Sequence, residues 1–353
     1  MKSIRAIALA LLAGLLAACA GSEPARSIKT YSIEEFLANT GVFGASFSPG
    51  GDMLLVSSDA SGTFNAYAIP VDGSPQQQLT DMEESVFVVS YFPDDERFLY
   101  SADVGGNELN HLYVREIDGS VNDLTPGEGL KAMFIDWAGD DESFFVATNE
   151  RDPKFFDVYE YQTDGYAREL RWQNDSGLQP ALVSPDGRFI ALVKTNTTSD
   201  SDIILHDTKS GESRNLTAHE GVVGNQPQAF SVDGKHLYYT SDADAEFAAL
   251  YRMNLATDES EQLLAPDWDV LYAYLSETGK YLVAGINNDA RTDLRMFEAA
   301  SMTPVALPEM PDAEITSVSI SPDETRMAFY ASASRVPRDL FVTDIDNGEP
   351  KQL

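Results

Sequence analysis

The sequence lacks several features from which a class of protein could be assigned directly, beginning with cysteine and basic residues. It has 353 residues but only one cysteine, so no disulfide bond within the chain can stabilise the fold. Lysine and arginine number 24 against 57 aspartate and glutamate residues, a net charge of -33. This disfavours nucleic acid as a partner, because a phosphate backbone binds through clustered basic side chains. The charge indicates a solvated acidic surface, with selective binding of cations or basic peptides as the alternative.

Catalytic motifs are absent as well. Gly-x-Ser-x-Gly, the nucleophile elbow of serine hydrolases, does not occur, and the string nearest to it, Gly44 to Ser48, lacks the second glycine. No two of the four histidines have the four-residue spacing of zinc peptidases. The acidic cluster Asp242, Asp244 and Glu246 lacks the glycine and terminal glutamate of a calcium loop, so we interpret it as turn residues. We expect no metal site and no cofactor, and the sequence alone leaves enzymatic activity open.

The amino terminus carries a hydrophobic run. Lys2 and Arg5 precede the apolar residues 6–18, which are too few to span a bilayer comfortably and end in small residues, as in a secretory signal peptide. Residues 16–19, Leu-Ala-Ala-Cys, resemble the lipobox of bacterial lipoproteins, and Cys19 is the only cysteine. The resemblance implies lipid attachment at Cys19 after removal of residues 1–18; a buried structural thiol is the alternative.

Ala20 follows Cys19, with no aspartate, which resembles the outer-membrane sorting pattern. We therefore expect a protein of the cell envelope, anchored by lipid to the outer membrane and facing the periplasm. Residues 19–41 are expected to form a tether and a short helix. Ser32 and Glu35 have the spacing of a capping box at the start of that helix.

From residue 42 onward one pattern recurs seven times. Its clearest copy is SPDGRFIALV, starting at Ser184: a tight Asp-Gly turn leads into an apolar strand that is expected to be buried on both faces. The residue before each acidic or glycine turn recurs every 44 to 47 residues, at Pro49, Pro93, Gly139, Pro185, Val232, Glu277 and Pro322. A leucine that closes each repeat follows the same period, at Leu79, Leu124, Leu170, Leu216, Leu263, Leu307 and Leu353.

A period near 45 residues with four strand-sized segments is typical of a propeller blade. In the fourth repeat we expect strands at residues 181–183, 189–193, 203–206 and 213–216. The sequence therefore predicts an all-β fold, a seven-bladed β-propeller of four-stranded antiparallel blades over residues 42–353.

Two stretches carry a family resemblance. Residues 101–113, SADVGGNELNHLY, and residues 149–159, NERDPKFFDVY, look like the amino-terminal propeller of prolyl oligopeptidase-family serine peptidases of the bacterial acylaminoacyl-peptidase-like kind. The resemblance covers residues 30–353. It implies a propeller that caps an α/β-hydrolase domain and restricts which peptides reach the catalytic serine.

The hydrolase motif is missing from this chain, so two hypotheses stay open. The first is a gating propeller whose catalytic domain lies beyond Leu353 or in another chain. The second is a stand-alone lipid-anchored scaffold, like the propeller of the Tol system, that binds an envelope protein. The Asn149 to Tyr159 string favours the first.

The working face is expected at the ends of the blades where the second and third strands connect, because these connections vary whereas the opposite turns are short. Arginines there could pair with a partner's carboxylates. Pairing with the local Asp152, Asp289, Asp293 or Asp339 is the alternative. The candidate partner-face residues are Glu108, His111, Asn149, Arg151, Asp152, Arg291, Arg335 and Arg338.

The ends of the propeller allow a prediction about ring closure. Blade one starts with its own inner strand and blade seven ends with its own outer strand, so no strand is left to complete a blade from the other terminus. We expect blades one and seven to meet through side-chain packing alone, and this seam to be the weakest.

Overall fold

The computed structural model describes residues 29–353 except 290, 335 and 347. The described residues divide into two units, residues 29–40 and residues 41–353. In the first, helix α2 (Ile33–Leu37) starts at the N-cap Ser32, whose side chain accepts a hydrogen bond from the Glu35 amide while the Glu35 carboxylate accepts one from the Ser32 amide. The predicted capping box is confirmed.

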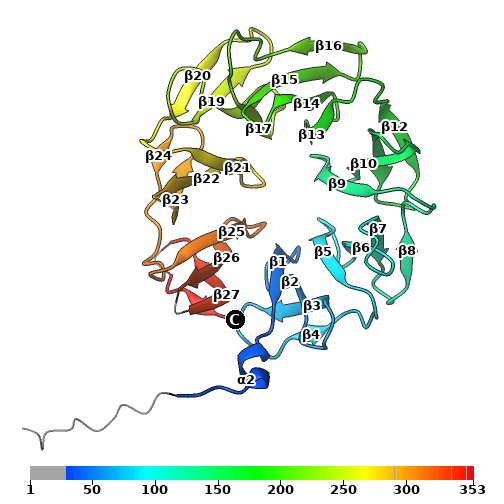
Figure 1. Cartoon of the computed structure of the whole chain (residues 1–353), viewed down its shortest axis with the longest axis vertical. Helices are drawn as coiled ribbons and strands as arrows, with labels where there is room; N and C mark the ends of the chain where they lie inside the picture. Colours follow the sequence, from blue (N-terminus) through cyan, green and yellow to red (C-terminus); the bar gives the residue numbers. More distant parts are fainter. Residues whose placement is uncertain (1–28, 290, 335, 347) are drawn as a thin grey trace, which may run out of the picture. The chain divides into compact units, whose positions relative to one another are not determined.

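The second unit consists of seven separate four-stranded antiparallel sheets, each formed by four consecutive strands, so the predicted seven-bladed propeller is confirmed. Figure 1 shows these sheets arranged in chain order around a centre, with the first strand of each blade innermost.

The strands of blades one to four follow in chain order. Blade one holds β1 (Val42–Phe47), β2 (Met53–Ser58), β3 (Asn65–Pro70) and β4 (Gln77–Gln78). Blade two holds β5 (Val86–Tyr91), β6 (Phe98–Ala102), β7 (His111–Arg115) and β8 (Val121–Asp123). Blade three holds β9 (Ala132–Trp137), β10 (Ser143–Asp152), β11 (Phe155–Gln162) and β12 (Arg168–Trp172). Blade four holds β13 (Gln179–Val183), β14 (Phe189–Thr197), β15 (Asp200–Asp207) and β16 (Glu212–Asn215).

The remaining three blades follow the same order. Blade five holds β17 (Asn225–Phe230), β18 (His236–Ser241), β19 (Ala249–Asn254) and β20 (Ser260–Leu264). Blade six holds β21 (Val270–Leu275), β22 (Tyr281–Asn288), β23 (Arg291–Glu298) and β24 (Thr303–Pro304). Blade seven holds β25 (Glu314–Ile320), β26 (Arg326–Ala333), β27 (Val336–Asp344) and β28 (Lys351–Gln352).

The recurring turn is held by its serine as well as by its glycine. Gly187 has φ +67°, a conformation that glycine adopts without strain. The buried Ser184 hydroxyl donates to the Asp186 carboxylate at 2.6 Å and accepts from the Phe189 amide at 2.8 Å. Ser231 and Ser321 make the same pair of bonds in blades five and seven. The serine of the repeat therefore closes the turn before each of these second strands.

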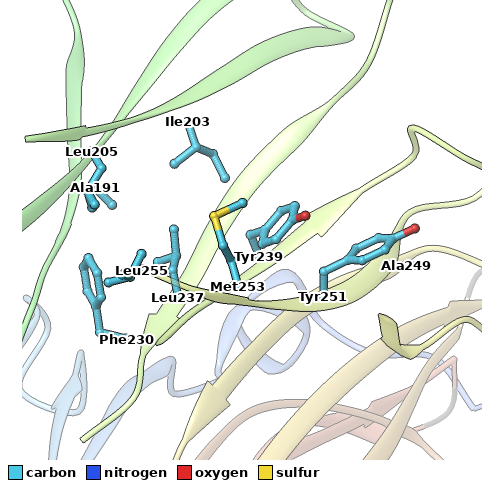
Figure 2. Close-up of a cluster of buried hydrophobic side chains, with 10 residues drawn as sticks. All are labelled: Ala191, Ile203, Leu205, Phe230, Leu237, Tyr239, Ala249, Tyr251, Met253 and Leu255. Carbon is cyan, nitrogen blue, oxygen red and sulfur yellow. The ribbon is translucent and has the colours of Figure 1, made fainter. Parts of the chain in front are cut away.

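The strands that follow these turns form the core. Ile190, Ala191 and Leu192 of β14 have no exposed surface, as expected for an apolar strand covered on both faces. Figure 2 shows one such contact, in which Ile203 and Leu205 of blade four meet Phe230 and residues of β18 and β19 in blade five. Each blade buries its faces against its neighbours.

Backbone hydrogen bonds also link neighbouring blades along the ring. The first amide of an inner strand donates to the carbonyl before the third strand of the preceding blade: Val86 to Phe64 at 2.8 Å, Ala132 to Asn110 at 2.8 Å and Val270 to Ala248 at 2.9 Å.

Blades one and seven meet differently. Within the described residues no backbone-to-backbone hydrogen bond joins them, and no strand is exchanged. Packing is nevertheless not the only contact, because side chains of blade seven donate to backbone carbonyls of blade one. The Ser319 hydroxyl donates to the Ala45 carbonyl at 2.6 Å, and the Tyr330 hydroxyl donates to the Gly44 carbonyl. The expectation that blades one and seven meet through side-chain packing alone is therefore wrong, and within the described residues each of the two blades consists of its own four strands.

Tyr330→Phe tests this seam. The variant leaves the Gly44 carbonyl without its donor, so we expect the free energy of unfolding in urea to fall by about 1 kcal/mol. Tyr113→Phe is the matched control, since no hydrogen bond is recorded for its hydroxyl among the described residues, and it should change stability by less than about 0.5 kcal/mol. Equal losses would contradict the role of this bond, and slowest hydrogen exchange in blade one or seven would contradict a weak seam.

Candidate functional site

A cavity of about 710 Å³ lies at the centre of the propeller and is lined by residues of all seven blades. The residues that set the period of the sequence repeat all line it. They are Pro49, Pro93, Gly139, Pro185, Val232, Glu277 and Pro322. The repeated turns therefore surround the end of the cavity at which the first and second strands of each blade connect.

A β-bulge interrupts each of the seven inner strands, as shifts in their pairing with the second strands show. A bulge leaves backbone groups unpaired and re-aims nearby side chains. Side chains of a neighbouring blade bind backbone groups at or beside these bulges: the Tyr274 hydroxyl donates to the Val318 carbonyl at 2.8 Å, and the Gln228 side chain accepts from the Ala273 amide at 2.9 Å. These bonds hold the cavity wall in place.

Further polar side chains of the wall are engaged in the same way. The Ser46 hydroxyl accepts from the Tyr91 amide at 3.1 Å, and the Trp137 indole donates to the Ser90 hydroxyl at 3.2 Å. Ser276 accepts from a backbone amide within its own turn. These groups connect blades or close turns, so their bonding capacity is largely used within the protein.

Three carboxylates line the cavity, Asp136, Asp141 and Glu277, and no lysine or arginine is among the lining residues. The Asp136 side chain is exposed to the cavity, but desolvation by the surrounding protein raises the pKa of its carboxyl to about 6. Burial also raises the pKa of Asp141 and of Glu277, with smaller contributions from nearby carboxylates. For Glu277 of blade six, one of these carboxylates is Asp141 of blade three, so a charge from another blade contributes to the raised pKa of Glu277.

The connections of the predicted working face are mostly strand extensions and not long loops. In blades three, four, six and seven the second and third strands continue to within two residues of each other, as in β10 and β11 or β14 and β15. Open connections remain in blades one, two and five. These polar segments extend as strands because pairing with the facing strand satisfies the hydrogen-bonding groups of their backbone.

Arg151 has a structural role. Its guanidinium binds the fully buried Asp157 carboxylate with two bonds of 2.7 and 2.9 Å and donates to the Asn174 carbonyl at 2.6 Å. Asp175 lies 3.3 Å away. The alternative of pairing with Asp152 is therefore wrong, because the strand pairing of β10 and β11 brings Asp157 opposite the base of the hairpin.

Asn149 and Asp152 serve the same hairpin. The Asn149 side chain accepts from the Lys131 amide at 2.6 Å and donates to the Pro153 carbonyl at 3.2 Å. Asp152 accepts from the Lys154 amide at 3.0 Å, which is a turn contact. The most specific part of the family resemblance thus builds a rigid hairpin.

In blade two, Glu108 has φ +60° and its amide donates to Asp103 at 2.7 Å, so it closes the open connection. His111 pairs with Asp123 at 2.9 Å and stacks beside Tyr113. Both residues therefore hold local structure on the predicted face.

The other described arginines of this face do not pair with the local aspartates. Arg291 lies 3.5 Å from the exposed Asp312 and not beside Asp289 or Asp293. Arg338 is exposed, and its guanidinium lies over the rings of Tyr330 at 4.1 Å and Phe43 at 5.2 Å. Arg338 thus spans the seam between blades seven and one instead of pairing with Asp339.

Two candidate residues, Arg335 and Cys19, lie outside the described residues. Asp136 was not identified from the sequence, because an aspartate within an apolar strand belongs to no motif. Its position in the repeat, which is also that of Ser46 and Ser90, could have indicated that it lines the cavity.

A hydrophobic cluster lies near the start of blades one and two. Phe64 contacts Phe43 at 5.3 Å and Phe87 at 5.8 Å between ring centres. Phe43 and Phe87 are each more than 40% exposed. The cluster lies at the working face, the end of the blades where the second and third strands connect. This face is therefore partly apolar.

Among the described residues, no group of three histidine, cysteine, aspartate or glutamate side chains has the arrangement of a metal site. In that same part of the chain no helix is long and apolar enough to cross a membrane.

Comparison with known proteins gives a family match: the family model of the prolyl oligopeptidase N-terminal β-propeller domain matches residues 78–353. Dipeptidyl aminopeptidase BIII of Pseudoxanthomonas mexicana is 25% identical over 243 residues, 65% of this chain and 35% of that protein. The Tol-Pal system protein TolB of Wolinella succinogenes is 23% identical over 210 residues, 59% of this chain and 46% of that protein. The chain thus spans less than half the length of either relative.

Solved structures show the same fold. A structure from a study of two prolyl endopeptidases has a TM-score of 0.70 at 14% identity, with 89% of this chain and 49% of that chain covered. An oligogalacturonate lyase in complex with manganese has a TM-score of 0.67 at 15% identity, with 87% and 90% covered. At such identities the likeness concerns the fold alone.

Arg151→Ala tests the structural role of this arginine. The change leaves the Asp157 carboxylate buried without its partner, so we expect the free energy of unfolding to fall by about 3 kcal/mol. Arg291→Ala is the control, because its contact to Asp312 is exposed, and it should change stability by less than about 0.5 kcal/mol. Urea unfolding of both variants measures the difference. A fully stable Arg151→Ala would show that the residue is free to serve a partner.

Proposed function

Since this chain belongs to the prolyl oligopeptidase N-terminal β-propeller family, we propose that it controls which peptides reach the active site of a serine peptidase. The catalytic α/β-hydrolase domain would lie beyond Leu353 or in a second chain, because Gly-x-Ser-x-Gly does not occur in this sequence. The propeller acts as a rigid ring that admits short extended peptides and excludes folded proteins.

The central cavity carries this proposal. Its volume of about 710 Å³ lies within the range of pockets that hold small ligands, about 300–1,000 Å³, so a short peptide fits and a folded domain does not. The interblade hydrogen bonds of its wall oppose widening of the ring. The apolar cluster of Phe43, Phe64 and Phe87 supports docking of the hydrolase domain at the working face, because exposed contiguous apolar surface marks interaction sites.

A stand-alone scaffold is the second candidate, favoured by the similarity to the TolB protein. In that case a folded envelope protein would bind at the working face, and the cavity would bind no peptide.

Photo-crosslinking separates the two functions. A short peptide carrying a benzophenone group should crosslink to lining residues such as Trp137 and Tyr274, as mapped by mass spectrometry, because the cavity admits an extended chain. A folded protein with the same label is the control and should not reach these residues. The purified chain should not react with a fluorophosphonate probe. Labelling of one serine, or peptide crosslinks only on outer strands, would contradict the proposal.

We also propose that Cys19 anchors the protein to a membrane of the cell envelope. The support is its place at the end of a lipobox-like sequence as the only cysteine. Attachment by lipid would keep the propeller at the periplasmic surface, where peptides are available.

Cys19→Ser tests the anchor. Without the thiol no lipid can be attached, so we expect the protein to move from the membrane fraction to the soluble periplasmic fraction, as measured by immunoblotting after fractionation. Ser22→Ala, which changes a nearby residue without removing the thiol, is the control and should leave the protein in the membrane fraction. An unchanged distribution of Cys19→Ser would contradict lipid attachment.

A further inference from the structure

The charges that face the cavity are all of one sign. Asp136 lies in the inner strand of blade three, Asp141 in the following turn, and Glu277 in the corresponding turn of blade six. No lysine or arginine lines the same space. A cleft lined by one sign of charge and walled by low-dielectric protein concentrates ions of the opposite sign.

The other polar groups of the wall are less available to bind a peptide in the cavity. Four side chains of the wall form hydrogen bonds with neighbouring blades: Tyr274, Gln228, Ser319 and Ser46. Asp136 accepts one bond, from the Trp137 amide at 2.9 Å, and its second carboxylate oxygen has no recorded partner within the described residues. The carboxylates are therefore the wall groups best able to act on a peptide inside the cavity.

The remaining wall is apolar and aromatic. Proline side chains surround the end of the cavity near the first turns, and Trp137, Tyr91 and Tyr274 contribute aromatic surface. Aromatic rings favour cations as well, since the ring face carries negative charge. A negatively charged segment would meet three carboxylates and no compensating base.

We propose that the cavity selects peptides by charge: Asp136, Asp141 and Glu277 favour segments that carry a positive group, either a lysine or arginine side chain or a free amino terminus, and repel acidic segments. The inference rests on the proposed gating function and names the class of peptide that the gate admits. The carboxylates are specificity-determining residues and take no part in bond cleavage.

Binding of labelled peptides to the intact chain tests the proposal. Four decapeptides of equal length would be compared by fluorescence anisotropy at low salt: acetylated with two lysines, acetylated and neutral, acetylated with two glutamates, and neutral with a free amino terminus. We expect the lysine peptide to bind roughly tenfold more tightly than the glutamate peptide. The free amino terminus should also improve binding over the acetylated neutral peptide. Added salt should reduce both differences.

Variants assign the selectivity to the cavity. Asp136→Asn with Glu277→Gln removes two of the three carboxylates and should reduce the difference between lysine and glutamate peptides severalfold, whereas Asp136→Glu, which keeps the charge, should retain it. Asp81→Asn with Glu212→Gln removes two exposed carboxylates outside the cavity lining and should leave the selectivity unchanged at the same net charge. Melting curves show whether each variant is folded.

The outcomes separate this inference from the proposed function. If all four peptides bind equally within the cavity, gating stands and charge selection is overturned. If the outer control variant loses selectivity as much as the cavity variant, the overall charge of the protein acts and the cavity carboxylates do not. If no peptide binds, the gating function fails, and charge selection fails with it.

Discussion

Burial of both faces of each four-stranded sheet is the constraint on which this propeller depends. The second strand of each blade is apolar on both faces, as Ile190, Ala191 and Leu192 show, and a sheet of this kind is stable only between two others. Seven sheets satisfy this requirement by closing into a ring. The seam between blades one and seven obeys the same rule and adds the Tyr330 and Ser319 hydrogen bonds to blade one.

Ring closure also creates the cavity. Each inner strand pairs on one side only, so its bulge and its free edge face the centre, where neighbouring blades satisfy some of these groups. The wall is thereby tied together by bonds between blades, and the carboxylates of Asp136, Asp141 and Glu277 are added to an otherwise apolar and internally bonded surface. A central cavity with acidic side chains in its wall follows from the same packing that stabilises the fold.

The hairpin of blade three shows how a family-specific string can be structural. Asn149, Arg151 and Asp152 are all engaged within the hairpin or with Asp157 and Asn174. Arg151 neutralises a carboxylate that is fully buried, and a buried charge is tolerated only when it is paired and hydrogen-bonded. Residues 149–159 therefore hold the β10–β11 hairpin in place at the working face. Any contribution of these residues to a partner interface would come from the position of this hairpin.

The sequence by itself determined the number of blades, their strand content and their turns, because these depend on local chemistry: an acidic or glycine turn followed by a continuous apolar strand recurs every 44 to 47 residues. Only the tertiary structure decided which charges meet. Arg151 binds Asp157, Arg338 lies over Phe43 from the other end of the chain, and Asp141 of blade three helps to raise the pKa of Glu277 in blade six. Such pairs depend on strand register and ring closure, which bring together residues far apart in the sequence, and the repeat pattern contains no information about them.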